Sequence, residues 1–308
     1  MTNNLMSLFM ESNLRYKLLL LICFFFSVAA CQSLPENFDK NKLGTVERDV
    51  TYCTMDGVDL TMDIYYPTTK EKQWPVIVYV HSGGWTSGTK AVGMVDKETL
   101  RETGFLLVSV EYRLAPTYKF PAMIEDVKCA VRFLRAHADY YNIDPERFGA
   151  IGLSAGGQLV SLLGLTDQTA GFDVGEYLNY SSQVQAVIDI CGVADLTPPF
   201  TKTLFFDRME VFGTFDDRDP IFAKASPVSY VTPGAPPFLM FHGEFDTTVP
   251  PKQSMRLLNH LQSNGVAAEL VLVKNADHSF LSANGNPIDP SLDEIENKIV
   301  SFFEQKLK

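Results

Sequence analysis

Hydrophobic positions follow two successive patterns along the chain. Residues 46–53 and 58–65 form two runs of β character that are separated by a short connection containing Gly57, which predicts a β-hairpin. From Pro75 onward, continuous apolar runs alternate with stretches of helical period. The apolar runs cover residues 76–80, 105–110, 148–151, 184–190, 238–241 and 269–273. Because these runs are apolar at nearly every position, they predict strands that are buried on both faces of a parallel sheet.

The stretches between these runs have the period of amphipathic helices. Residues 121–138 place four apolar residues at three- and four-residue spacing, with acidic and basic residues at the other positions. The apolar positions are Ile124, Val127, Val131 and Leu134, and the charged positions are Glu125, Asp126, Lys128, Arg132 and Arg135. Residues 155–165, 251–263 and 291–305 predict further helices. The alternation predicts a doubly wound α/β fold whose functional loops lie at the C-terminal ends of the strands.

Residues 195–235 interrupt this alternation after the sixth predicted strand. The segment is rich in Phe, Pro and Asp. We interpret it as a cap or substrate-binding loop over the C-terminal edge of the sheet, with an ordinary surface excursion as the alternative. Its aromatic residues either contact the substrate or form a small core of the loop itself. They are Phe200, Phe205, Phe206, Phe212 and Phe215.

The first thirty residues have the pattern of a targeting segment. Arg15 and Lys17 precede an apolar run at residues 18–30 that ends on small residues, which is typical of a signal peptide. The run is too short to span a bilayer, since about 20 residues are needed. The residues before Cys31 resemble a bacterial lipobox, so we expect lipid attachment at Cys31 and a polar tether up to residue 46. Plain secretion and an uncleaved anchor are the alternatives.

This interpretation gives three parts: a signal peptide at 1–30, a lipidated tether at 31–46 and a catalytic domain at 47–308. It predicts an exported protein that is lipid-anchored in the bacterial cell envelope, in the periplasm or at the outer membrane. Three cysteines then remain in the domain, so at most one disulfide is possible there. We interpret Cys129 and Cys191 as buried free thiols. No cysteine or histidine spacing indicates zinc.

Charge excludes one class of partner. The net charge is −11 over 308 residues, and basic residues are scattered along the chain. Nucleic-acid binding requires a basic face, so we expect no nucleic-acid partner.

The pentapeptide GLSAG at residues 152–156 places Ser154 between a predicted strand and a predicted helix. A nucleophile on such a sharp turn needs small neighbours, because larger side chains would collide with the strand or the helix. Gly152 and Gly156 meet this requirement. Three fixed positions are weak evidence by themselves, and the placement between strand and helix makes Ser154 the candidate nucleophile.

The segment HSGGW at residues 81–85 follows a predicted strand directly. Backbone N–H groups stabilise an oxyanion only where no side chain blocks their approach. We therefore expect Gly83 and Gly84 to form an oxyanion hole together with the N–H of Ala155. For His81 we expect a structural role in bracing this loop.

Two further candidates follow the last two predicted strands. Asp246 ends the segment HGEFD at 242–246, and His278 lies in NADHSF at 275–280. The chain order of nucleophile, acid and base matches that of hydrolases with a strand–turn–helix nucleophile. Glu244 competes with Asp246 as the acid, and Asp277 adjoins the base. We expect His137 and His260 to face solvent and His242 to be a structural neighbour of the acid loop.

Several ordered blocks give the chain a family resemblance. They are HSGGWTSGTK from residue 81, EYRLAP from 111, FPAMIEDVKCAVRFL from 120, GLSAGGQL from 152, SPVSYV from 226, FHGEFDTTVP from 241 and DHSF from 277. These blocks resemble bacterial α/β-hydrolase esterases of the hormone-sensitive-lipase and feruloyl-esterase-like group, the BD-FAE-like esterases. Ser82 stands where that group usually has a glycine, which leaves Gly83 and Gly84 in place.

The resemblance implies an α/β-hydrolase fold, a mostly parallel sheet, hydrolysis of short-chain carboxylic esters and no metal or organic cofactor. Some members of the group deacylate plant cell-wall polysaccharides, so acetyl or feruloyl esters of glycans are candidate substrates beside small-molecule esters. Cleavage of amides or peptides is a variant of the same chemistry. A non-catalytic binding protein on this scaffold is the alternative from another class.

Overall fold

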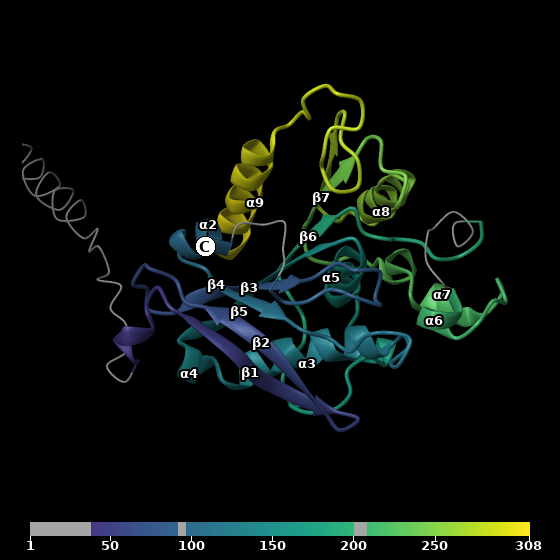
Figure 1. Cartoon of the computed structure of the whole chain (residues 1–308). Helices are drawn as coiled ribbons and strands as arrows, with labels where there is room; N and C mark the ends of the chain where they lie inside the picture. The colour runs from purple at the N-terminus through teal and green to yellow at the C-terminus, as the bar shows by residue number, and fades with distance from the viewer. Residues whose placement is uncertain (1–37, 92–96, 200–207) are drawn as a thin grey trace, which may run out of the picture. The chain divides into compact units, whose positions relative to one another are not determined.

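The computed structural model of the chain describes residues 38–91, 97–199 and 208–308, and it has a strand at each predicted place. The strands are β1 (Val46–Met55), β2 (Val58–Tyr65), β3 (Trp74–Val80), β4 (Leu106–Val110), β5 (Ile143–Leu153), β6 (Ala186–Ile190), β7 (Phe238–Gly243) and β8 (Ala268–Val273). They form one sheet in the order β1-β2-β4-β3-β5-β6-β7-β8 (Figure 1). The predicted hairpin β1–β2 is antiparallel and adds to β4, whereas every pair from β4 to β8 is parallel.

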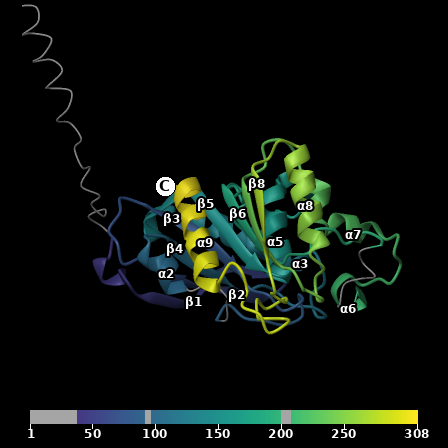
Figure 2. The same cartoon turned by 90° about the horizontal axis from the view of Figure 1, so that it is seen from above.

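Helices cover both faces of the sheet, as the continuous apolar strands require. The long helices are α3 (Ala122–Ala136), α5 (Ala155–Leu165), α8 (Lys252–Ser263) and α9 (Leu292–Leu307). The short helices are α2 (Lys97–Glu102), α4 (Ala138–Tyr141), α6 (Arg208–Phe212) and α7 (Pro220–Lys224). Alternate residues of β3 face different cores: Val78 packs with α3, α5 and α8, and Ile77 packs with α2 and α9. Figure 2 shows α9 on the opposite side of the strands from α3.

The charged face of α3 is buried, although its pattern is that of a surface helix. Lys128 and Arg132 have fully buried side chains, and both form ion pairs of 2.8 Å with Asp173. Arg135 donates to the carbonyls of Pro145, Ser181 and Gln183. Residues 166–183, which connect α5 to the region before β6, therefore lie over the polar side of the helix. These ion pairs satisfy charges that would otherwise be expensive to bury.

One expectation about the cysteines is wrong. Cys53 on β1 and Cys129 on α3 form a disulfide, so Cys129 is not a free thiol. The strand and the helix pack against each other, which brings together two residues that lie 76 positions apart. Cys191 is free and buried, as expected.

The signal peptide, Cys31 and the first part of the tether lie outside the described residues, as do Phe200, Phe205 and Phe206. The described part of the predicted tether packs on the domain, because Phe38 is buried against the rings of Tyr66 and Trp74. A 3₁₀ turn, η1 (Lys40–Lys42), then leads into β1.

Among the described residues, no helix is both long enough and apolar enough to cross a membrane.

Candidate active site

Ser154 occupies the sharp turn between β5 and α5. Its backbone has φ 57° and ψ −114°, a conformation that is strained for a residue with a side chain. A Cβ on Gly152 would lie 2.3 Å from the carbonyl oxygen of Gly156, and a Cβ on Gly156 would lie 2.2 Å from that of Val80. The turn therefore requires both glycines, for the steric reason that the sequence suggests.

The loop after β3 carries the second part of the site. Gly83 has φ 118°, and a Cβ there would lie 2.0 Å from the carbonyl oxygen of Ser87. Gly84 also has a positive φ, of 59°. Within the described part of the chain, the N–H groups of Gly83, Gly84 and Ala155 donate to no protein acceptor. They are therefore available to a ligand.

The acid and the base meet on the loops that follow β7 and β8. His278 Nδ1 lies 2.6 Å from Asp246 Oδ2. The other carboxylate oxygen accepts the backbone N–H groups of Thr248 and Val249, each at 2.8 Å. Burial by itself would raise the pKa of Asp246, but hydrogen bonds from His242, His278 and the Val249 N–H hold that pKa well below its usual range. Asp246 is therefore a carboxylate at neutral pH.

One cavity of about 360 Å³ brings these parts together. Its lining includes Ser154, His278 and the glycine loop, together with apolar side chains. The lining residues are Ser82, Gly83, Gly84, Trp85, Leu153, Ser154, Ala155, Val193, Thr248, Val249, His278 and Ser279. Among the described residues, no hydrogen bond joins the Ser154 hydroxyl to His278. Such bonds are often long in ligand-free enzymes and shorten when substrate is bound.

The competing candidates have other places. Glu244 is exposed and accepts the backbone N–H of Asn275. Asp277 accepts the N–H groups of Ser279 and Leu281, so it stabilises the base loop.

The other histidines do not line the cavity. His81 is buried, stacks on Tyr112 at 4.1 Å and contacts the carbonyl of Ser82, which suits a brace for the glycine loop. Burial lowers the pKa of His81. His137 and His260 are half-buried rather than fully solvent-facing.

Two residues that the sequence analysis did not assign to the site fasten its parts to each other. The indole N–H of Trp85 donates to Gln158 Oε1 at 3.1 Å, and Gln158 Nε2 donates to the carbonyl of Ala225 at 2.7 Å. The bridge connects the glycine loop, the nucleophile helix and the inserted segment. The sequence signal for Gln158 was weak: it is a polar residue on a mostly apolar helix, as is Ser161.

Phe212 and Phe222 of the insertion belong to a small aromatic core, whereas Phe215 is exposed. Phe212 packs on Phe222 at 5.4 Å and on Trp85 at 6.0 Å between ring centroids. No described residue of the insertion lines the cavity. Its predicted role as a substrate-binding loop stays a prediction.

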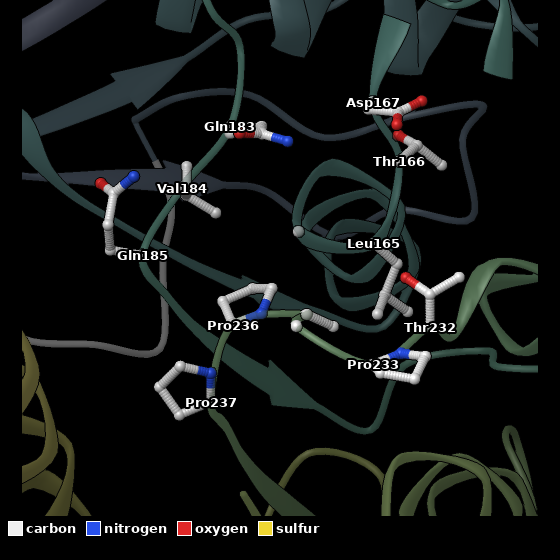
Figure 3. A pocket seen from close by; sticks show the side chains of 13 residues that line it. Leu165, Thr166, Asp167, Gln183, Val184, Gln185, Thr232, Pro233, Pro236 and Pro237 are labelled. Carbon is white, nitrogen blue, oxygen red and sulfur yellow. The ribbon is translucent and has the colours of Figure 1, made fainter. Parts of the chain in front are cut away.

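A second cavity, of about 550 Å³, lies at the other end of the strands, where β6 and β7 begin (Figure 3). Its walls are the end of α5 and the segments before β6 and β7, with Pro233, Pro236 and Pro237 on one side. Its lining includes no histidine, cysteine, lysine or arginine. It therefore lacks the serine and the imidazole that line the smaller cavity, so the cavity at Ser154 is the candidate active site.

The fold and this site define a class: the chain has the α/β-hydrolase fold, with the strained turn at Ser154, the glycine loop and the Asp246–His278 pair at the C-terminal ends of the strands. A model of the BD-FAE family matches residues 62–261. The chain belongs to that family.

Individual proteins agree with this assignment. Esterase LipC of Mycobacterium tuberculosis is 33% identical over 198 residues, which are 62% of this chain and 49% of LipC. A truncated carbohydrate esterase from gut microbiota superposes with a TM-score of 0.74 at 24% identity, covering 87% of this chain and 98% of the other. Esterase Est2 of Thermogutta terrifontis, solved with propionate bound, gives a TM-score of 0.67 at 26% identity, covering 88% and 93%.

The chain spans about half the length of LipC and of the other M. tuberculosis esterases that it matches, LipQ and LipM.

Proposed function

We propose that this protein is a serine hydrolase of carboxylic esters, with Ser154 as nucleophile, His278 as base and Asp246 as the acid that orients the base. One observation carries the proposal: a single cavity is lined by the strained serine, two glycines with free N–H groups and the imidazole that Asp246 holds. Each group is weak evidence alone. Their convergence supports acyl transfer.

In the first half of the reaction, the Ser154 hydroxyl attacks the ester carbonyl carbon while His278 Nε2 takes its proton. The carbonyl oxygen becomes an oxyanion, which the N–H groups of Gly83, Gly84 and Ala155 stabilise. Because Asp246 is ionised and bonded to Nδ1, it holds the imidazole in the required tautomer and stabilises the imidazolium. His278 then donates its proton to the leaving alcohol.

In the second half, water attacks the acyl-enzyme carbonyl and gives a proton to His278. The same N–H groups stabilise the second oxyanion. The intermediate collapses with release of the carboxylic acid, and His278 returns the proton to Ser154.

The cavity supports a short acyl group. Its volume of about 360 Å³ has to hold part of the alcohol as well as the acyl chain. Esterase Est2, which is similar to this chain, has been solved with propionate and with butyrate. We therefore expect acetyl to butyryl esters to be preferred over octanoyl esters.

The alcohol part is proposed to be a sugar hydroxyl of an acylated glycan. Three lining residues, Ser82, Thr248 and Ser279, have hydroxyl groups and are at least partly exposed. Hydroxyl groups at these positions suit hydrogen bonds to neighbouring hydroxyls of a sugar ring. Acetylated and feruloylated oligosaccharides are the substrates that test this part.

The test is hydrolysis of p-nitrophenyl acetate, butyrate and octanoate by the protein and by its Ser154→Ala variant. We expect turnover that falls with chain length and is lost in the variant. A folded wild type that binds these esters and the acylated sugars without turnover would favour the non-catalytic binding protein. Turnover of the matching p-nitroanilides at a comparable rate would favour the amidase variant.

Export and lipid attachment at Cys31 are proposed with this function. The Cys53–Cys129 disulfide supports export, because disulfides persist in oxidising compartments. Mass spectrometry of the mature N-terminus after membrane fractionation tests the proposal. An acylated Cys31 in the membrane fraction is the expected result, and an unmodified N-terminus in the soluble fraction would contradict it.

A further inference from the structure

A second imidazole lies behind the Asp246 carboxylate, and the reaction proposed above does not use it. His242 is on β7, and its side chain is fully buried. Its Nε2 lies 2.8 Å from the carbonyl oxygen of Val249 and 3.3 Å from Asp246 Oδ2. Asp246 Oδ2 is the oxygen that His278 contacts. One carboxylate oxygen is therefore shared by two imidazoles.

The partners of His242 define its tautomer. A carbonyl oxygen can only accept a hydrogen bond, so the contact with Val249 places a proton on Nε2. The same N–H is then directed toward Asp246. In a neutral ring Nδ1 has to accept, and its hydrogen-bond partner among the described residues is the Ser254 hydroxyl, at 2.7 Å. A hydroxyl can donate, so it satisfies the ring in this tautomer.

Ser254 is itself held firmly. It lies in the first turn of α8 and is completely buried. Its neighbour Gln253 accepts the backbone N–H groups of Ala194 and Asp195 and donates to the carbonyl of Asp195. The start of α8 is therefore fastened to the loop after β6, beside the cavity residue Val193.

Two further polar groups, from β6 and the residue after it, lie near His242 and Asp246. The Sγ of Cys191, which follows β6, lies within 4.8 Å of an imidazole nitrogen of His242 and of a carboxylate oxygen of Asp246. Burial raises the pKa of the Cys191 thiol, so this group is uncharged. Asp189 on β6 is buried and bonded to the Ser161 hydroxyl and the Gly192 N–H. Both nitrogens of His242 are already used in hydrogen bonds, which argues against a metal ion at this cluster.

We propose that His242 and Ser254 are positioning residues for the catalytic acid: Ser254 fixes the tautomer of His242, and the Nε2–H of His242 shares the charge of Asp246 with His278. The inference rests on the proposed esterase function. A neutral donor at Oδ2 keeps the carboxylate in place without cancelling its charge. Because this donor interacts with part of the Asp246 charge, the carboxylate holds the proton on His278 less strongly, and His278 can release that proton in the next step.

Two substitutions of His242 separate this role from simple packing. The amide nitrogen of His242→Gln reaches the position of Nε2 and keeps a donor near Asp246. The shorter His242→Asn reaches only the position of Nδ1, so the donor is lost. His260→Asn on α8 is the matched control, since His260 lies away from the cavity lining.

The experiment measures kcat and KM for p-nitrophenyl acetate across pH. We expect His242→Asn to lower kcat about ten- to a hundredfold with KM little changed, because the acid is misplaced while the cavity is intact. The acidic limb of its pH profile should shift to higher pH by about 0.5 units. The reason is that the Asp246 charge then acts on His278 alone and favours the imidazolium. His242→Gln should lie between Asn and wild type in kcat and keep the wild-type limb.

A second readout does not depend on activity. In ¹⁵N-histidine-labelled protein, the His242 resonances should show the Nε2-protonated tautomer, and Ser254→Ala should change the Nδ1 shift. Equal kcat and equal pH limbs for Asn, Gln and wild type, in folded protein, would overturn this inference alone. The Nδ1-protonated tautomer in wild type would overturn it as well. A folded wild type without esterase activity would instead overturn the proposed function and this inference together.

Discussion

Two buried carboxylates in this molecule have opposite kinds of partner. Asp173 lies under the charged face of α3 and bonds to Lys128 at 2.8 Å, to Arg132 at 2.8 Å and to the Ser182 hydroxyl at 2.6 Å. Asp246 bonds to two backbone N–H groups and two imidazoles. Burial alone would raise both pKa values, yet the hydrogen bonds lower the pKa of Asp173 and, more strongly, that of Asp246.

The difference lies in what happens to the negative charge. Lys128 and Arg132 together more than balance the charge of Asp173, and these ion pairs join α3 to residues 166–183. Among the described residues, Asp246 contacts backbone amides and imidazoles but no lysine or arginine. Its charge therefore remains available to the imidazolium that we propose forms on His278. We therefore expect Asp173 to contribute to the free energy of unfolding and Asp246 to contribute to the rate of the reaction.

The largest expected effect is on rate. Asp246→Asn keeps the shape of the side chain but removes its charge and favours the wrong tautomer of His278. We expect kcat for p-nitrophenyl acetate to fall about 10⁴-fold while the protein stays folded. A fall of less than tenfold would mean that Asp246 is not the acid, and the proposed difference between Asp246 and Asp173 would then be wrong.

The next effect is on stability. Asp173→Asn leaves Lys128 and Arg132 as buried charges with a neutral partner, and we expect a loss of about 3–5 kcal/mol in the free energy of unfolding. The kcat of the folded fraction should stay at the wild-type value, because Asp173 does not line the cavity. Urea unfolding followed by circular dichroism measures the change. Asp289→Asn is the control: its ion pair with Lys274 is exposed, so its free energy of unfolding should stay close to that of the wild type.

The disulfide adds a covalent link to the same helix. Replacing Cys53 and Cys129 together by alanine should lower the free energy of unfolding by about 2–4 kcal/mol, because a long loop of the unfolded chain is no longer closed. Esterase activity at 25 °C should persist. A variant as stable as wild type under oxidising conditions would show that the bridge does not form.

The smallest effect concerns pH. Because the folded pKa of Asp173 is lower than the unfolded value, its stabilisation is present above the unfolded pKa near 3.8 and is lost as pH falls through the folded pKa. Between pH 5 and pH 3 the wild type should therefore lose more stability than Asp173→Asn. Parallel stability curves for the two proteins would contradict the assigned direction.

The positions of the strands and of the long helices followed directly from the sequence. Burial on both faces leaves a continuous apolar run, and burial on one side leaves a helical period, so β3 and α8 can be predicted without coordinates. Ser154 could be predicted for a similar reason, because its strained turn requires Gly152 and Gly156 at fixed distances along the chain. Asp246 and His278 were predicted from their positions after the last two strands and from the order of the three candidates along the chain.

Other features depend on contacts between residues far apart in the chain. The charged side of α3 has the pattern of a solvated face, and residues 166–183 cover it without any periodic signal of their own. Cys53 and Cys129 gave no sign of pairing, because only the packing of β1 on α3 brings them together. The contact between Ser254 and His242 also could not be predicted. Nothing in the sequence distinguishes a serine in the first turn of a helix that bonds to a histidine from one that does not.

Sequence alone thus determined the fold class and indicated candidate residues for the chemistry, because strands, helices and tight turns impose local constraints on residue type. The tertiary structure decided which charges are cancelled and which remain available. That outcome depends on the atoms within a few ångströms of each carboxylate, and those atoms come from segments that the sequence does not place beside one another.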